Sequence, residues 1–291
     1  MTRPGHGDRR RRFSRHTTLW ALAALAVCAG CAASATQRAQ TLVREHREQE
    51  AATELERRLA AHPEDTAARR LLVRVLGFTG DLAGARAQSE ELARRLGPAG
   101  AATAHVELGH ALELAHRYDE ALAEYDEAAA AAPASPDGPR EGGMRCAHWG
   151  EAEQARPRLE EAVRRGARDA ETWHTLGLVR LRLGDLDAAE EAYRAGIAAD
   201  PRAAESWLGL ATVGMARGDA RAVLDAYDQV LARRPRFAPA ELGRAWALAQ
   251  LGRGVEAARA LDHAAELGAP SANVARLRSA IAAGAVGDAG H

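Results

Sequence analysis

The chain has 291 residues, of which 47% are hydrophobic but only 4% aromatic, so a thick core of large side chains is excluded. Alanine, leucine, glutamate and arginine dominate, and these residues favour helices over strands. Residues 1–30 hold six of the 39 basic residues against one acid, which leaves the rest of the chain with a net charge of about −6. That acidic balance argues against nucleic acid as the main partner.

The first thirty residues have the features of an export signal. A basic segment, residues 1–16, precedes the uncharged apolar run Leu19–Gly30. A membrane-spanning helix needs roughly 20 apolar residues, and this run is shorter, so it fits a signal peptide better. We therefore expect residues 1–30 to be a signal peptide and the protein to be exported.

Two cleavage patterns follow the apolar run. Residues 29–31 (Ala-Gly-Cys) resemble a bacterial lipobox, which predicts lipidation of Cys31, although residue 28 is cysteine where that pattern prefers leucine. Residues 33–35 (Ala-Ser-Ala) instead fit an ordinary signal peptidase site before Thr36. The first pattern predicts a membrane-anchored lipoprotein facing the periplasm and the second a secreted or periplasmic protein; an uncleaved anchor is the third alternative.

A 34-residue repeat runs through most of the remaining sequence. Three pairs of large or helix-ending residues show the spacing: Trp173 and Trp207, Tyr193 and Tyr227, Pro201 and Pro235. The register defines six frames: 66–99, 102–135, 136–169, 170–203, 204–237 and 238–271. Position 8 is Gly or Ala in five frames, and position 20 is Ala in five. Small residues at these two positions let two antiparallel helices cross closely, so each frame predicts a helix pair.

This pattern of Trp, Leu, Gly, an aromatic residue, small residues and Pro resembles the tetratricopeptide repeat over residues 66–271. The resemblance implies an all-α fold, a right-handed superhelix of about six helix-turn-helix repeats with capping helices at both ends. We expect residues 31–65 to form a linker and an amino-terminal capping helix, or half-repeat, with one continuous helix over 38–61. Residues 272–291 should form a carboxy-terminal capping helix, apolar on one face, and a disordered tail.

Two adjacent positions predict how the helices of a pair are joined. Glycine at position 15, as in Gly184 and Gly218, can adopt the left-handed conformation that ends the first helix. Aspartate at position 16, as in Asp81, Asp185 and Asp219, is placed to cap the second helix.

Frame 136–169 is the least regular. Glycine and proline crowd its first helix, which we expect to be short and to start near Pro139. Pro157 falls inside the second helix, where an interior proline costs about 3 kcal/mol or more. The frame is either a decayed repeat held by its neighbours or a hinge between a two-repeat and a three-repeat block.

The sequence carries no motif for a nucleotide, a nucleophile elbow or a helical zinc site, so we expect no catalysis, no cofactor and no metal. The alternative is an enzyme or metal-dependent thiol protein that uses Cys146 with His148. The competing interpretation places Cys146 in the core as a small apolar residue. A transition-metal site formed by His110, Met144, His148 and His174 is the alternative to a solvated polar wall.

In tetratricopeptide superhelices the first helices of the pairs line a concave groove, so the resemblance implies a partner site there. The early groove positions are mixed in character: Arg70, Arg74, Phe78, Val106, His110, Glu113 and Leu114. The later positions are mostly apolar and form the expected partner-binding groove: His174, Leu178, Leu181, Arg182, Leu208, Thr212, Met215, Leu242 and Trp246. By the same resemblance Trp173 and Trp207, at position 4, are structural.

The family's chaperone-tail clamp uses lysine and asparagine, whereas this chain has no lysine and its only asparagine, Asn273, lies outside the groove. That activity is therefore not carried over. We expect a non-catalytic scaffold or adaptor that binds a protein or peptide segment in its groove. Its export signal would make it a lipoprotein that aids assembly of an envelope complex.

Overall fold

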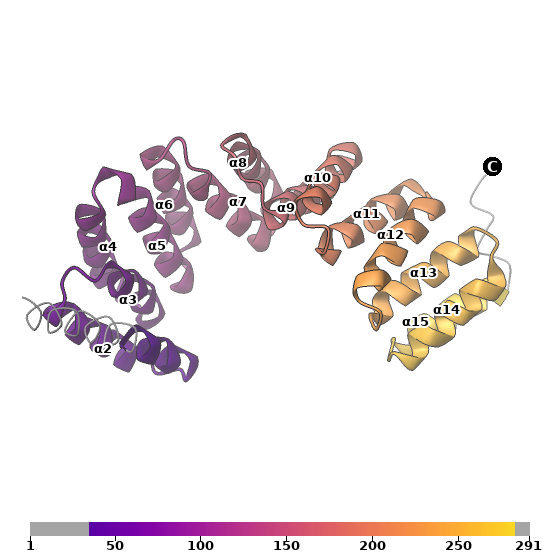
Figure 1. Ribbon diagram of the computed structural model, residues 1–291, viewed down its shortest axis with the longest axis horizontal. Coiled ribbons are helices and arrows are strands. Elements are labelled where there is room, and N and C mark those ends of the chain that lie inside the picture. Colours follow the sequence, from indigo (N-terminus) through magenta and orange to yellow (C-terminus); the bar gives the residue numbers. More distant parts are fainter. Residues whose placement is uncertain (1–34, 283–291) are drawn as a thin grey trace, which may run out of the picture. The chain divides into compact units, whose positions relative to one another are not determined.

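The computed structural model describes residues 35–282, which are almost entirely helical and contain no strand (Figure 1). The expected all-α fold of stacked helix pairs is therefore confirmed. The expected signal peptide, the lipidation site Cys31 and the tail 283–291 lie outside the described residues, so those expectations stay predictions. Within residues 35–282 no helix combines the length and the apolar character needed to cross a membrane.

The chain divides into two compact units, residues 1–132 and 133–291. The described part of unit 1 contains residues 35–44, which are helical, and the elements α2 Glu48–Ala61, α3 Thr66–Thr79, α4 Leu82–Leu96, the 3₁₀ turn η1 Pro98–Gly100, α5 Ala101–Leu114 and α6 Tyr118–Ala131. The described part of unit 2 contains α7 Asp137–Trp149, α8 Ala152–Arg164, α9 Ala170–Arg182, α10 Leu186–Ala199, α11 Ala204–Arg217, α12 Ala220–Arg233, α13 Ala238–Gln250, α14 Gly254–Glu266 and α15 Ser271–Ala282. Each of the six frames thus holds one helix pair, and the two helices of every pair pack against each other.

The continuous helix expected over 38–61 is wrong. Residues 45–47 interrupt it, because His46 adopts a left-handed backbone with φ of 57°. The amino-terminal part of unit 1 is therefore a pair of helices, residues 35–44 and α2, and α2 packs against α3.

The junctions inside the pairs follow the predicted chemistry. Gly184 and Gly218 have φ of 82° and 72°, the left-handed conformation that glycine adopts without steric cost. The side chain of Asp219 accepts hydrogen bonds from the backbone amides of Arg221 and Ala222, at the start of α12. Asp81 and Asp185 cap α4 and α10 in the same way.

The first helix of frame 136–169 is longer than expected. It spans Asp137–Trp149 and is therefore not short, but it does begin near Pro139, which occupies its first turn as expected, where a proline costs no helix hydrogen bond. The second helix, α8, continues through Pro157, which is exposed. The hinge interpretation stays a prediction.

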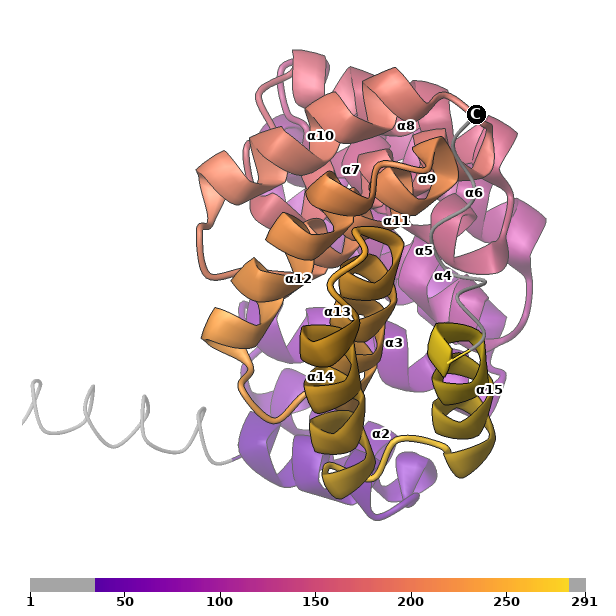
Figure 2. The ribbon, with the colours of Figure 1, turned by 90° about the vertical axis from the view of Figure 1, so that its right-hand side faces the viewer.

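The core is built from small residues in contact with a few large ones. Tyr193 of α10 is fully buried against Gly177 of α9, where an added Cβ would lie 2.7 Å from the Cδ1 atom of the ring. At the carboxy terminus, α15 packs against α14 and α13 (Figure 2). Its Val274 is buried, and Leu277 and Ile281 pack beside it, as the predicted apolar face requires.

Candidate functional site

The nine predicted groove residues all lie in unit 2, on α9, α11 and α13. The helices α9 and α11 pack against each other, and Leu181 of α9 packs on the cluster that contains Val213 of α11. Leu208 of α11 and Trp246 of α13 pack on one further cluster, which includes the buried Ala211 and Ala245. The structure thus brings these positions of the repeat onto neighbouring helices.

The predicted groove residues differ in exposure. Arg182, Thr212 and Met215 are exposed, and Met215 shows 39% of its surface to solvent. The other six are half-buried: His174, Leu178, Leu181, Leu208, Leu242 and Trp246. The apolar groove residues are therefore mostly half-buried and not fully exposed. Met215 is the most exposed apolar residue among them.

Polar contacts fix two of the groove side chains, and a ring contact holds a third. Arg182 donates to the carbonyl oxygen of Ala147 at 3.0 Å, and Thr212 donates to the carbonyl of Leu208 at 3.0 Å. The His174 ring lies 5.7 Å from the Tyr193 ring, and burial lowers the pKa of His174. Burial disfavours the charged form of His174, and Arg182 keeps its positive charge while its hydrogen bond to the Ala147 carbonyl holds it in place.

A buried carboxylate that the sequence analysis did not single out organises the early groove positions in unit 1. Glu107 of α5 has a side chain only 1% exposed and accepts a hydrogen bond from the Nε of Arg70 at 2.8 Å and from Arg74. Burial alone would raise the pKa of Glu107, but hydrogen bonds from His110, Arg74 and Arg70 outweigh that effect and hold its pKa at about 2. The two arginines are thereby neutralised in part and held along α3.

The structure does not support the hypothesis that Cys146 and His148 act together as a reactive thiol site. Cys146 is fully buried in α7, as the packing interpretation predicts, whereas His148 is exposed two residues further along the same helix. Residues two apart point to different sides of a helix, so the pair is not arranged as a nucleophile and its base. Between residues 35 and 282 no group of three or more His, Cys, Asp or Glu side chains is arranged to hold a metal ion.

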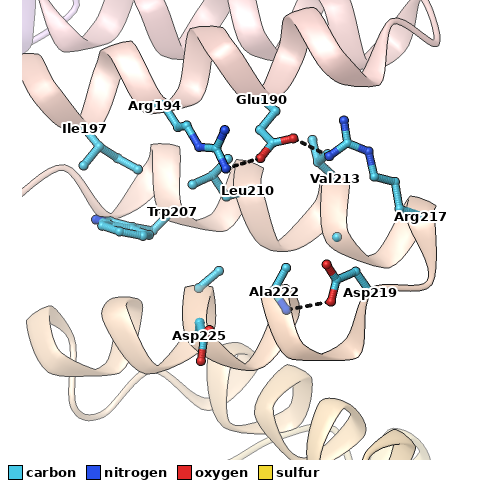
Figure 3. A pocket seen from close by; sticks show the side chains of 12 residues that line it. Glu190, Arg194, Ile197, Trp207, Leu210, Val213, Arg217, Asp219, Ala222 and Asp225 are labelled. Carbon is cyan, nitrogen blue, oxygen red and sulfur yellow. Dashed lines mark hydrogen bonds and ion pairs between the residues drawn. The ribbon is translucent and has the colours of Figure 1, made fainter.

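A pocket lined by residues of α11 other than the groove residues is shown in Figure 3. It has a volume of about 360 Å³ between α10, α11 and α12, and Trp207, Leu210 and Ile197 provide its apolar wall. Glu190 lies at its rim and pairs with Arg194 at 2.5 Å and with Arg217. Trp207, which the resemblance implies to be structural, is half-buried and lines this pocket.

A family model described as the tetratricopeptide repeat matches residues 72–136 and 174–222. The sequence matches none of the curated proteins. Among solved structures, the carboxy-terminal part of a tetratricopeptide repeat-containing protein from Cytophaga hutchinsonii is similar, with a TM-score of 0.63, 14% identity, and coverage of 83% of this chain and 98% of that one.

Two further solved structures show the same fold. YrrB, described as a tetratricopeptide protein with an unusual peptide-binding site, has a TM-score of 0.56, 17% identity, and coverage of 61% of this chain and 92% of its own. PilW, described as a type IV pilus biogenesis factor, has a TM-score of 0.50, 18% identity, and coverage of 70% and 94%. The matched segments, the 34-residue register and the helix pairs agree, so residues 72–136 and 174–222 match tetratricopeptide repeats and the chain has the tetratricopeptide-repeat fold.

Proposed function

We propose that the chain is a non-catalytic adaptor that binds a protein or peptide segment along the groove residues of α9, α11 and α13. The observation that carries the proposal is that Met215 on α11 is exposed while Leu178 on α9 and Trp246 on α13 are half-buried. Large apolar groups that stay accessible on a folded surface often mark binding sites, and methionine adapts to varied partners. The similar protein YrrB is described as having a peptide-binding site, which supports this class of function.

The exposed groups among the groove residues indicate which kind of partner segment could bind there. Its accessible groups are one thioether, one hydroxyl that is already bonded to its own helix, and one arginine tethered to Ala147. Such a surface offers apolar contact and few free hydrogen bonds, so it suits the apolar face of an amphipathic helix. An extended polar peptide would leave its own backbone groups unpaired there.

We further propose that the mature protein is a lipoprotein attached through Cys31 and facing the periplasm, where it aids assembly of an envelope complex. The support is the lipobox-like sequence after the apolar run Leu19–Gly30. The intact mass of protein purified from native membranes should show a lipid adduct on Cys31 and no preceding residues. An unmodified chain that begins at Thr36 would contradict lipidation and leave export intact.

The groove proposal is tested by placing a charge at its most accessible apolar residue. Met215→Glu should leave the fold unchanged, because the residue is exposed, and should weaken binding of the partner captured by the mature chain by about tenfold or more. Ala258→Glu is the matched control, since Ala258 is an exposed position on α14, away from the groove residues. Equal partner binding by the two variants would refute the proposed site.

A further inference from the structure

Two pockets of the same construction occur in consecutive repeats of unit 2. The pocket in Figure 3 is walled by Trp207 and Leu210, and a second pocket, of about 560 Å³ between α8, α9 and α10, is walled by Trp173 and Leu176. The paired residues occupy positions 4 and 7 of their frames. An alanine at position 23 completes both walls, Ala226 in one pocket and Ala192 in the other.

The two aromatic walls are a local feature of the sequence. Position 4 is Trp only in the frames that begin at 170 and 204, whereas the other frames carry Arg69, His105, Pro139 and Glu241 there. The groove positions 5, 9 and 12 point to another side of the same helices, because successive helical residues turn by about 100°. The two pockets therefore form a second surface, distinct from the proposed groove.

The positive charges at these pockets are already neutralised by the chain. Arg217 pairs with Asp187 and Glu190, and Arg180 pairs with Glu160 at 3.0 Å. Arg194 is likewise held by Glu190, and Arg164 by Glu161. Each arginine that lines a pocket thus already lies beside a carboxylate of the chain.

Each pocket has an accessible carboxylate at position 22 of its frame, and the first pocket is also lined by the exposed Asp219, whose side chain caps α12. In the second pocket the carboxylate at position 22 is Glu191, which is exposed and makes no ion pair with any residue that the structure describes. In the first it is Asp225, whose side chain is 61% exposed and whose nearest cation, Arg221, lies 3.4 Å away and is itself 70% exposed. Screened pairs of this kind are weak and are exchanged readily for a better partner.

We propose that this surface binds a basic segment of a partner protein, with one arginine or lysine side chain in each pocket. The aliphatic stem of such a side chain would pack on the tryptophan and leucine wall, while its cation would reach Asp225 or Glu191. Long basic side chains commonly bury their stems in this way and leave the charged head at an acidic rim. Tryptophan is also the aromatic residue that interacts most favourably with cations, and Arg233 of the chain itself already lies over the Trp207 ring, 5.3 Å from its centroid.

The pocket itself is tested by filling it. Fluorescence anisotropy with the full chain would measure the affinity for a fluorescein-labelled peptide of alternating leucine and arginine. Ala222→Phe, which places a ring in the pocket of Figure 3, should weaken binding of this peptide by about tenfold, or about 1.4 kcal/mol. Ala232→Phe is the matched control, because Ala232 is exposed on the same helix but does not line the pocket. Equal affinity of the two variants would overturn the proposal.

The charge preference needs a separate measurement. The double variant Asp225→Asn, Glu191→Gln should bind the same peptide about fivefold more weakly, as expected for the loss of two exposed pairs. Glu266→Gln removes an exposed acid on α14 and should leave the affinity unchanged. Equal weakening by both variants would mean that the peptide is attracted diffusely to an acidic protein. Tighter binding of a peptide of leucine and glutamate would mean that the pockets prefer acidic side chains. Either result refutes the proposal.

The two proposed surfaces can fail independently. Met215→Glu should not change the affinity for the arginine peptide, because Met215 lies outside both pockets. If Met215→Glu abolished binding while Ala222→Phe did not, the peptide would occupy the groove, and the proposed pocket site would be wrong.

Discussion

Replacing Glu107 by glutamine should destabilise unit 1 through loss of a buried charge and not through loss of volume. The side chain is 1% exposed, and both Arg70 and Arg74 donate to it. The pKa of Glu107 falls from 4.5 to about 2 because hydrogen bonds and charge outweigh burial. At about 1.4 kcal/mol per pH unit, this difference corresponds to about 3 kcal/mol of stability at neutral pH.

The sign of the pH dependence follows from the direction of that change. The folded state holds the carboxylate at a lower pKa than the unfolded state, so the stabilisation is complete well above pH 4.5 and is lost as the pH falls towards 2. Glu107→Gln should therefore lower the free energy of unfolding by up to about 3 kcal/mol at pH 7. At pH 3 the difference between the two proteins should shrink to about half or less.

Hydrogen exchange in increasing urea, read in peptides from α3 and α5, measures this free energy in unit 1 directly. The tryptophans among residues 35–282 all lie in unit 2, so their fluorescence would report on the wrong unit. Glu127→Gln, an exposed acid on α6, is the control and should change nothing. A loss that is the same at pH 7 and pH 3 would show that packing, not charge, makes Glu107 stabilising.

Three further predictions concern unit 2. Gly177→Ala should lower stability by about 1–3 kcal/mol in urea unfolding followed by tryptophan fluorescence, because the new Cβ would lie 2.7 Å from the Tyr193 ring; an unchanged midpoint would contradict this packing. Asp219→Ala should cost about 1 kcal/mol in the same assay, since the α12 cap is lost, while Asp219→Asn should retain most of the stability. Amide exchange should be fastest, among the full repeats, in residues 137–165, and uniform protection across the repeats would exclude a hinge there.

The helix pairs could be predicted because the residues that build them act locally and recur at a fixed spacing. Small residues at position 8 and aspartate at position 16 determine a crossing and a cap without reference to distant parts of the chain. The break at 45–47 follows the same register, since His46 is position 15 of a frame that would begin at 32. His116, at position 15 of its own frame, is also left-handed, so the position and not only glycine selects that conformation.

The repeat does not predict the burial of a side chain whose surroundings come from several helices. Glu107 lies in the helix Ala101–Leu114, where small and apolar residues dominate, and its burial depends on Arg70 and Arg74, which reach it from α3. Isolated buried carboxylates are costly, so an acid at an inward position without a visible partner would have been placed at the surface. A search for arginines one repeat earlier at positions 5 and 9 could have identified this cluster.

The partial burial of the groove residues follows from the high alanine content of the core. The core beneath α11 and α13 is largely alanine, including Ala211, Ala240 and Ala245, and alanine leaves room that larger neighbours fill. Leu208 and Trp246 therefore pack inward onto this core instead of standing free on the surface. A partner that binds at the groove residues must therefore make its apolar contacts chiefly with Met215 and with the solvent-exposed parts of these half-buried side chains. Affinity at this surface should then depend on the shape of the partner helix more than on burial of any one tryptophan.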